Sequence, residues 1–253
     1  MNIEERLLQI NQYSRSGEKQ NSIEYIVIHW IGNANTSALA NRNYFNNLPS
    51  INAERISKGL PPIYASSHLI VGLNGEKIRC IPNDEVAFHS GSYSMNRKSI
   101  GIETCHPDWG GRFNDVTYNS LVELTAELCK EYGIGINNVI RHYDVTGKDC
   151  PKYYVENPSE WDKFKQDVQR KINGEEIIPE PERSDEPVRV YQNGSTREDI
   201  YADTYLTKKI GSLSPYESCD CFGEFNGRVM VRYNVDGTDN YKIGFAKWVN
   251  GIK

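Results

Sequence analysis

The sequence has no excess of positive charge. It contains 29 Lys and Arg residues against 34 Asp and Glu residues, which gives a net charge of -5. Proteins that neutralise the phosphate backbone of nucleic acids carry clustered basic residues instead. We therefore expect no nucleic-acid partner.

Long apolar runs are also missing. No stretch approaches the roughly 20 apolar residues that are needed to span a bilayer, so we expect no membrane insertion. The first residues, MNIEERLLQINQ, lack the basic start and the apolar run of a secretory signal. This pattern predicts synthesis in the cytoplasm without a signal peptide, so that any work outside the cell follows another route of release.

The six cysteines lack the paired spacing that is typical of the disulfide framework of small secreted domains. Cys80, Cys105 and Cys129 each lie among Ile, Leu or Thr and are predicted to be small core residues. Cys219 and Cys221 have no histidine nearby and are too few for a zinc knuckle. Cys150 lies in the polar segment 141–150, together with His142.

One segment divides the chain. Residues 174–187, GEEIIPEPERSDEP, hold six acidic side chains, one Arg and three prolines, a composition typical of a stiff, solvated linker. The predicted domains are therefore residues 1–173 and residues 188–253.

Strand-like and helix-like patterns alternate in residues 1–173. Apolar runs predict strands at 24–30 and 99–105, and two strands at 67–81 meet at Asn74-Gly75, a strong hairpin signal. Helical spacing covers 36–48, 117–134 and the stretch from Trp161 to Ile172. This alternation predicts an α/β domain with a mixed central sheet flanked by helices.

Residues 188–253 differ in composition and pattern from residues 1–173. They hold ten aromatic residues and short apolar runs, broken by Asn-Gly or Asp-Gly pairs at 193–194, 226–227 and 236–237. Short strands at this spacing predict a small all-β barrel. The aromatics are either core residues or a surface for sugars and peptides.

The segment RHYDVTGKDC, residues 141–150, places His142 and Cys150 near one another in sequence. In a continuous helix they would lie about 12 Å apart along the axis, too far for metal–ligand bonds of about 2.0–2.3 Å. A shared metal site requires the chain to fold back, and Gly147 provides a turn residue. A catalytic zinc needs a third protein ligand, and His29, near the end of a predicted strand, is a candidate because ligands gather at strand ends.

Five motifs occur in an order that resembles a known family. They are YIVIHWIG, SSHLIVGLNGEKIRCIP, AFHSG, SIGIE and VIRHYDVTGKDCP, within residues 22–172. The order is similar to that in zinc-dependent N-acetylmuramoyl-L-alanine amidases of the phage-lysozyme and peptidoglycan-recognition type. The resemblance implies an endolysin that lyses the cell wall, of phage, prophage or bacterial origin, with bacterial peptidoglycan as its partner and an SH3-like wall-binding domain at 188–253.

The resemblance also implies roles for single residues. His29, His142 and Cys150 match the ligands of one Zn²⁺, Lys148 matches a lysine that faces the substrate carbonyl, and Glu103 matches an acidic residue that activates water. His68 and His89 lie in motifs near the family's cleft and are candidates for substrate contact or for structural roles. Ser67 stands where some phage members have a catalytic tyrosine, which makes Glu103 the expected base.

The chemistry of these residue types agrees with that assignment. Zinc makes hydroxide available from water near neutral pH, Glu103 is able to accept a proton, and Lys148 is able to stabilise charge on the amide oxygen. Two alternatives remain open: a module that binds peptidoglycan without cutting it, and a thiol hydrolase with Cys150 as nucleophile and His142 as base. The sequence leaves the oligomeric state, the host and the wall chemotype undetermined.

Overall fold

The computed structural model consists of two compact units, Met1–Ile177 and Ile178–Lys253. Most of the predicted linker 174–187, and the turns predicted at 226–227 and 236–237, lie outside the described residues. The described residues are 2–175, 187, 189–202, 206, 208–225, 228–235, 241–247 and 251–252.

The N-terminal unit contains a six-stranded sheet in the order β1-β4-β3-β5-β2-β6. Neighbouring strands are parallel, except that β3 and β4 are antiparallel. The mixed sheet predicted from sequence is confirmed. The strands are β1 (Glu4–Glu5), β2 (Tyr25–Trp30), β3 (Leu69–Val71), β4 (Lys77–Arg79), β5 (Ser99–Thr104) and β6 (Val139–Arg141).

The predicted strands and hairpin are present. The four central residues of β2 are buried, as expected for a β-branched apolar run in a parallel sheet. The β3–β4 hairpin turns at Asn74-Gly75, where Gly75 has a φ of 76°, a conformation that favours glycine.

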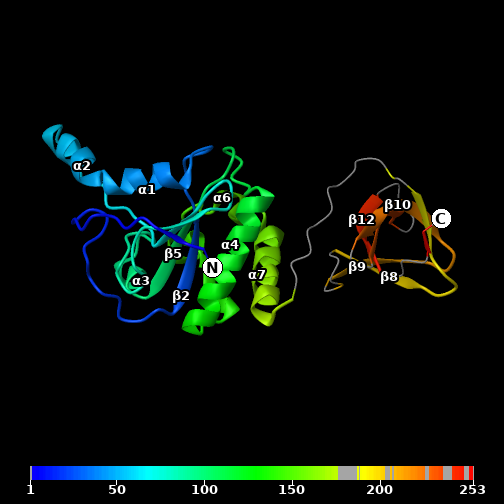
Figure 1. The fold of residues 1–253 in the computed structure, drawn as a ribbon. Helices are drawn as coiled ribbons and strands as arrows, with labels where there is room; N and C mark the ends of the chain where they lie inside the picture. Colours follow the sequence, from blue (N-terminus) through cyan, green and yellow to red (C-terminus); the bar gives the residue numbers. More distant parts are fainter. Residues whose placement is uncertain are drawn as a thin grey trace. The chain divides into compact units, whose positions relative to one another are not determined.

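Two long helices cover one face of the sheet and lie side by side, α4 (Asp115–Tyr132) and α7 (Pro158–Asn173) (Figure 1). The Asn114 side chain caps the start of α4 by accepting a hydrogen bond from the Thr117 N–H, and Gly133 ends the helix in the left-handed region. The apolar faces predicted for both helices pack on Ile26, Ile28 and their neighbours in the larger core of this unit.

The other face carries α1 (Ala38–Asn46), the N-terminal arm at residues 6–20 and several loops. Phe45 of α1 and Leu8 of the arm pack on Ile70 and Ile78 in a second apolar cluster. The sequence prediction ended the first helix at residue 48, but a second helix, α2 (Leu48–Ser57), follows directly and projects beyond the rest of the unit (Figure 1). The short elements are α3 (Tyr93–Asn96), η1 (Ile136–Asn138), α5 (His142–Thr146) and α6 (Lys152–Glu156).

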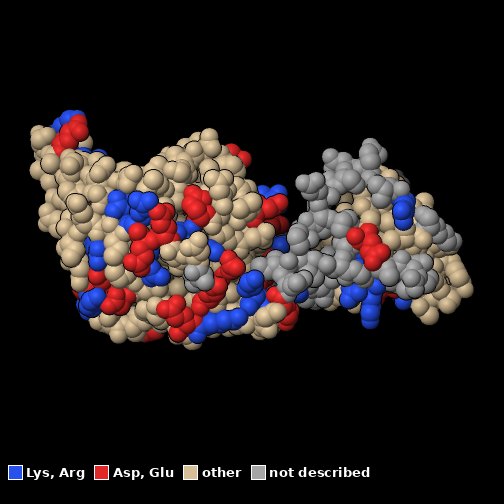
Figure 2. Space-filling view, viewed as in Figure 1, with Lys and Arg blue, Asp and Glu red and all other residues tan. Residues whose placement is uncertain are grey.

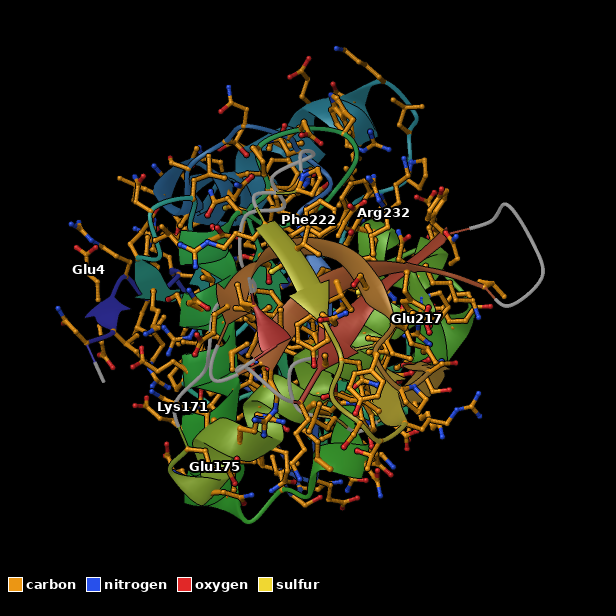
Figure 3. All side chains as sticks on the ribbon, turned by 90° about the vertical axis from the view of Figure 1, so that its right-hand side faces the viewer. Glu4, Lys171, Glu175, Glu217, Phe222 and Arg232 are labelled. Atoms are coloured by element: carbon orange, nitrogen blue, oxygen red, sulfur yellow. The ribbon has the colours of Figure 1, made fainter. Side chains whose placement is uncertain are left out.

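The C-terminal unit forms one antiparallel sheet in the order β7-β10-β11-β12-β8-β9. Arg232 on β11 forms an ion pair with Asp220, and its guanidinium carbon lies 5.6 Å from the ring centre of Phe222 (Figure 3). The predicted all-β class is confirmed, and the SH3-like assignment stays a prediction. The strands are β7 (Arg189–Gln192), β8 (Glu198–Tyr201), β9 (Lys209–Leu213), β10 (Ser218–Phe225), β11 (Arg228–Asn234) and β12 (Tyr241–Ala246).

Charges of both signs are interspersed on the visible face of the N-terminal unit (Figure 2). This distribution agrees with the small net charge of -5. None of the helices in the described part of the chain combines the length and the hydropathy that a membrane span requires.

Candidate metal centre

Three side chains that are distant in sequence meet at the carboxyl end of the central strands. One nitrogen each of His29 and His142, together with Sγ of Cys150, all lie within 4.8 Å of one another. His29 is the fifth residue of β2, and His142 directly follows β6, the strand that pairs with β2. All three residues are buried. The structure therefore brings together the three ligands expected from the sequence.

The loop between His142 and Cys150 turns back at the predicted residue. The short helix α5 ends at Gly147, which has a φ of 75° in the left-handed region. The return is held by the Tyr143 N–H, which donates a hydrogen bond of 2.9 Å to the Cys150 carbonyl. The chain reversal predicted for a shared metal site is confirmed.

Burial keeps both histidines neutral. It lowers the pKa of His29 well below its usual value, and His89, His142 and Lys148 lower it further. It also lowers the pKa of His142 to about 4, with Lys148 acting in the same direction and a hydrogen bond to the Ser90 backbone opposing it. Within the described part of the chain, His142 Nδ1 has no hydrogen-bond partner. Neutral imidazoles with a free nitrogen are the form that binds metal.

The thiol of Cys150 completes the donor set. Its Sγ lies 3.7 Å from His29 Nδ1, and burial raises the pKa of the thiol to about 12. Two imidazoles and one cysteine are a donor set typical of zinc, and three protein ligands leave the fourth position open for chemistry. The residues present therefore fit a catalytic zinc ion.

A pocket of about 490 Å³ borders this cluster, and Glu103, His142 and Lys148 contribute to its lining. Glu103 lies on β5 and is half-buried, and its Oε2 atom has no hydrogen-bond partner among the residues described. Burial raises the pKa of Glu103 to about 8, while the positive charge of Lys148 lowers it. Lys148 itself is exposed. A glutamate and a lysine thus line the pocket beside the candidate ligands.

His68 and His89 are buried and contact protein groups. His68 Nδ1 accepts a hydrogen bond of 3.0 Å from the Gly101 N–H, and its Nε2 lies 2.9 Å from the Glu85 carbonyl oxygen. His89 Nδ1 lies 3.0 Å from His29 Nε2, and His89 also lines the pocket. A substrate contact by either histidine stays a prediction.

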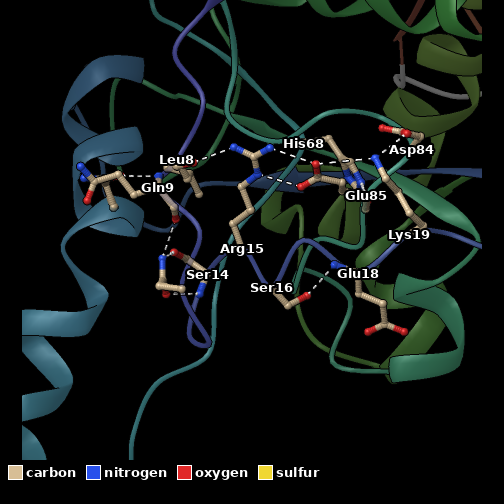
Figure 4. Close-up of polar contacts among 12 residues, drawn as sticks. Leu8, Gln9, Ser14, Arg15, Ser16, Glu18, Lys19, His68, Asp84 and Glu85 are labelled. Atoms are coloured by element: carbon tan, nitrogen blue, oxygen red, sulfur yellow. Dashed lines mark hydrogen bonds and ion pairs between the residues drawn. The ribbon is translucent and has the colours of Figure 1, made fainter.

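An ion pair supports this region from the N-terminal arm (Figure 4). Arg15 donates hydrogen bonds from Nε and Nη2 to the two carboxylate oxygens of Glu85, at 2.7 and 2.9 Å, and from Nη1 to the Leu8 carbonyl. The backbone carbonyl of Glu85 is the group that contacts His68. The arm therefore holds the loop on which the His68 ring depends.

Sequence reasoning missed the aromatic wall of the pocket. Tyr64, Phe45 and Phe88 line it, and Tyr64 is 56% exposed. The Pro61-Pro62 pair indicates an irregular segment before β3, but no periodicity shows that its tyrosine turns toward the pocket. Ser67, by contrast, is buried, and its hydroxyl donates a hydrogen bond to the Leu69 carbonyl at 3.0 Å.

Comparison with known proteins gives a consistent match for the N-terminal unit. Residues 19–153 match the N-acetylmuramoyl-L-alanine amidase family. A probable N-acetylmuramoyl-L-alanine amidase of Bacillus licheniformis is 34% identical over 171 residues, which cover 64% of this chain and 45% of that protein. The amidase BlyA of Bacillus subtilis is 29% identical over 187 residues, covering 66% and 47%. The chain thus spans about half the length of these curated relatives.

Solved structures agree with these matches. A mutant endolysin from Bacillus subtilis superposes with a TM-score of 0.53 at 26% identity, covering 66% of this chain and 99% of that chain. The PlyG catalytic domain superposes with a TM-score of 0.56 at 25% identity, covering 72% and 100%.

Proposed function

The chain belongs to the N-acetylmuramoyl-L-alanine amidase family, and on this basis we propose that it is a zinc-dependent peptidoglycan amidase. It hydrolyses the amide bond between the lactyl group of N-acetylmuramic acid and the L-alanine of the stem peptide. The observation that carries the proposal is the approach of His29, His142 and Cys150 to within 4.8 Å, beside a pocket that contains Glu103 and Lys148. As an endolysin, the protein would lyse the bacterial cell wall.

His29, His142 and Cys150 would hold the metal ion. Zinc at this position supplies Lewis acidity, which makes hydroxide available from water near neutral pH. Cys150 would bind as the thiolate, so that metal binding releases the proton that burial otherwise retains on the sulfur.

Glu103 is the proposed base. Its Oε2 atom is free of protein hydrogen bonds throughout the described chain and is able to accept a proton from the attacking water. Once protonated, the carboxyl group is able to give that proton to the leaving amine of L-alanine. The Ser67 hydroxyl is buried and committed to the Leu69 carbonyl, which supports Glu103 over this position.

Lys148 is the proposed oxyanion stabiliser. Lys148 lines the pocket, and its positive charge lowers the pKa of Glu103. Negative charge builds on the amide oxygen as water attacks, and a cation placed for that charge stabilises the transition state. His68 and His89 are proposed to position other groups, since their ring nitrogens contact the protein.

The C-terminal unit is proposed to hold the enzyme on the wall. It is all-β and exposes aromatic side chains, with Tyr216 66% and Tyr241 62% exposed. A binding unit joined by a linker raises the effective concentration of the catalytic unit at its substrate. Its ligand would be a peptidoglycan component or another cell-wall polymer.

The proposal is tested on purified cell walls. The zinc-loaded full chain should release stem peptides with new L-alanine amino termini and leave the glycan strands intact, as identified by mass spectrometry. A folded, zinc-loaded protein that binds walls without releasing such termini would instead be a recognition module. Activity that survives complete zinc removal but is lost in Cys150→Ala would indicate a thiol hydrolase.

A further inference from the structure

The two ring nitrogens of His29 face different partners. Nδ1 lies 3.7 Å from Cys150 Sγ, within the candidate metal centre, and Nε2 lies 3.0 Å from His89 Nδ1. A neutral imidazole carries one proton, and only the other nitrogen has a lone pair for a metal. The position of that proton on His29 therefore decides whether its metal-facing nitrogen is able to bind.

The hydroxyl of Ser99 sets the direction of the hydrogen bonds behind His89. Ser99 Oγ donates to the Met95 carbonyl oxygen at 2.7 Å, and a carbonyl only accepts. Since the hydroxyl has a single proton, its contact of 3.1 Å with His89 Nε2 requires that nitrogen to be the donor. The Ser99 backbone also accepts a hydrogen bond from His89. His89 is therefore protonated on Nε2.

The same logic extends to His29. A neutral His89 that is protonated on Nε2 has its lone pair on Nδ1, so its 3.0 Å contact with His29 requires the proton of His29 to be on Nε2. Both rings are buried, and burial disfavours the charged form of an imidazole. The lone pair of His29 is then on Nδ1, the nitrogen that faces Cys150.

We propose that Ser99 and His89 are positioning residues that fix His29 as its Nε2–H tautomer and hold its Nδ1 lone pair toward the metal centre. The inference rests on the proposed metal site and adds the groups that prepare one of its ligands. Partners of this kind behind a metal-binding histidine fix its tautomer and ring orientation.

The backbone of β5 holds the His89 ring in place. A Cβ on Gly101 would lie 2.5 Å from His89 Cγ, so the ring rests on a position that only glycine leaves open. The rings of His29 and His89 meet edge-on, with centroids 5.1 Å apart and planes at 89°. Ser99 is fully buried and His89 is 7% exposed. The hydrogen-bond chain is thus enclosed and has little room for alternative arrangements.

The direct test is the tautomer of His29 in the metal-free, full-length protein. Long-range ¹H–¹⁵N spectra of histidine rings distinguish protonation on Nδ1 from protonation on Nε2. We expect His29 and His89 to be protonated on Nε2 in the wild-type chain. A proton on Nδ1 of His29 would overturn the inference, whether or not any variant folds.

Zinc affinity, measured by competition with a chromophoric chelator, provides the second readout. His89→Phe keeps the ring but removes the acceptor for His29, and should weaken zinc binding about 10- to 100-fold. Ser99→Ala should weaken it less, and His89→Asn, whose amide oxygen is able to replace Nδ1 as acceptor, should recover part of the loss. The matched control is Ser120→Ala, which removes another buried serine hydroxyl that donates to a carbonyl, that of Gly75, and should leave zinc affinity unchanged.

The outcomes separate this inference from the proposed function. Unchanged zinc affinity in folded His89→Phe and Ser99→Ala would overturn the positioning role, even if the wild-type chain were an active amidase. A wild-type chain that binds no zinc would refute the proposed function, and the ring spectra would still decide the tautomer.

Discussion

His29 on β2 and Glu103 on β5 occupy directly paired positions in the parallel sheet. Paired residues on neighbouring strands point to the same face, so the candidate ligand and the candidate base leave the sheet side by side. His142 joins them from the end of β6, on the other side of β2. A shift of one residue in the register of β5 would turn Glu103 to the opposite face, toward α4 and α7.

The role of Glu103 predicts a loss of turnover without a loss of metal. Glu103→Gln keeps the size of the side chain but is unable to accept a proton, so kcat should fall by roughly 10²- to 10⁴-fold, the usual contribution of a general base. Zinc content, measured by atomic absorption, should stay at the wild-type level. Near-normal kcat in this variant would remove Glu103 from the chemistry.

Glu103 should also affect the pH dependence of the stability of the fold. Burial raises its pKa to about 8 in the folded, metal-free chain, so folding favours the protonated carboxyl and its contribution is lost as the pH rises from about 4.5 through 8. The site histidines are already neutral between pH 6.5 and 8. Over this range the free energy of unfolding of the wild type should therefore fall by roughly 1 to 2 kcal/mol more than that of Glu103→Gln. Urea unfolding in the presence of a chelator measures this difference, and parallel curves for the two proteins would contradict the raised pKa.

Lys148 should affect the transition state rather than metal retention. Lys148→Ala removes the cation proposed to face the amide oxygen, so kcat should fall by about 10²- to 10³-fold, as for other lost oxyanion donors. Lys152→Ala is the matched control, because this lysine begins α6 two residues after Cys150 and donates to the Trp109 carbonyl. Equal losses in both variants would point to a general disturbance of the loop.

The C-terminal unit should increase activity on intact cell walls but not on small soluble substrates. A variant that ends at Glu175 keeps all of α7 and its Gly174 cap. It should cleave soluble muropeptides at the wild-type rate and lose about tenfold or more of its activity on intact walls, because the tethering effect is removed. Turbidity clearance and peptide release from the two substrates measure the ratio, and equal activity on walls would show that the unit contributes no tethering.

Local sequence patterns predicted the scaffold of the site. The run at 24–30 and the Asn74-Gly75 pair specify β2 and the hairpin, because strand burial and turn conformation depend on nearby residues. Gly147 likewise marks the turn that returns Cys150 to His142. Helix α2 was missed because Pro49 at its first turn resembles the end of the preceding helix in sequence.

Features that depend on packing between distant segments could not be predicted from the sequence. His68 and His89 could be placed near the cleft, but their hydrogen bonds to Gly101 and His29 arise only when β3, β5 and the intervening loop are assembled. The contact of Arg15 with Glu85 joins segments 70 residues apart, and neither residue belongs to a recognisable motif.

The central claim is a metal ion held by two imidazoles and one thiolate. Zinc K-edge X-ray absorption of the purified full chain, together with zinc quantification, tests it most directly. We predict one zinc per chain with two nitrogen ligands and one sulfur ligand from the protein. Cys150→Ser should lose the sulfur ligand and retain zinc much more weakly. Cys129→Ser, a change at a buried cysteine of α4, should keep both the sulfur ligand and the zinc. A zinc shell without sulfur in the wild type, or full zinc occupancy in Cys150→Ser, would contradict the account.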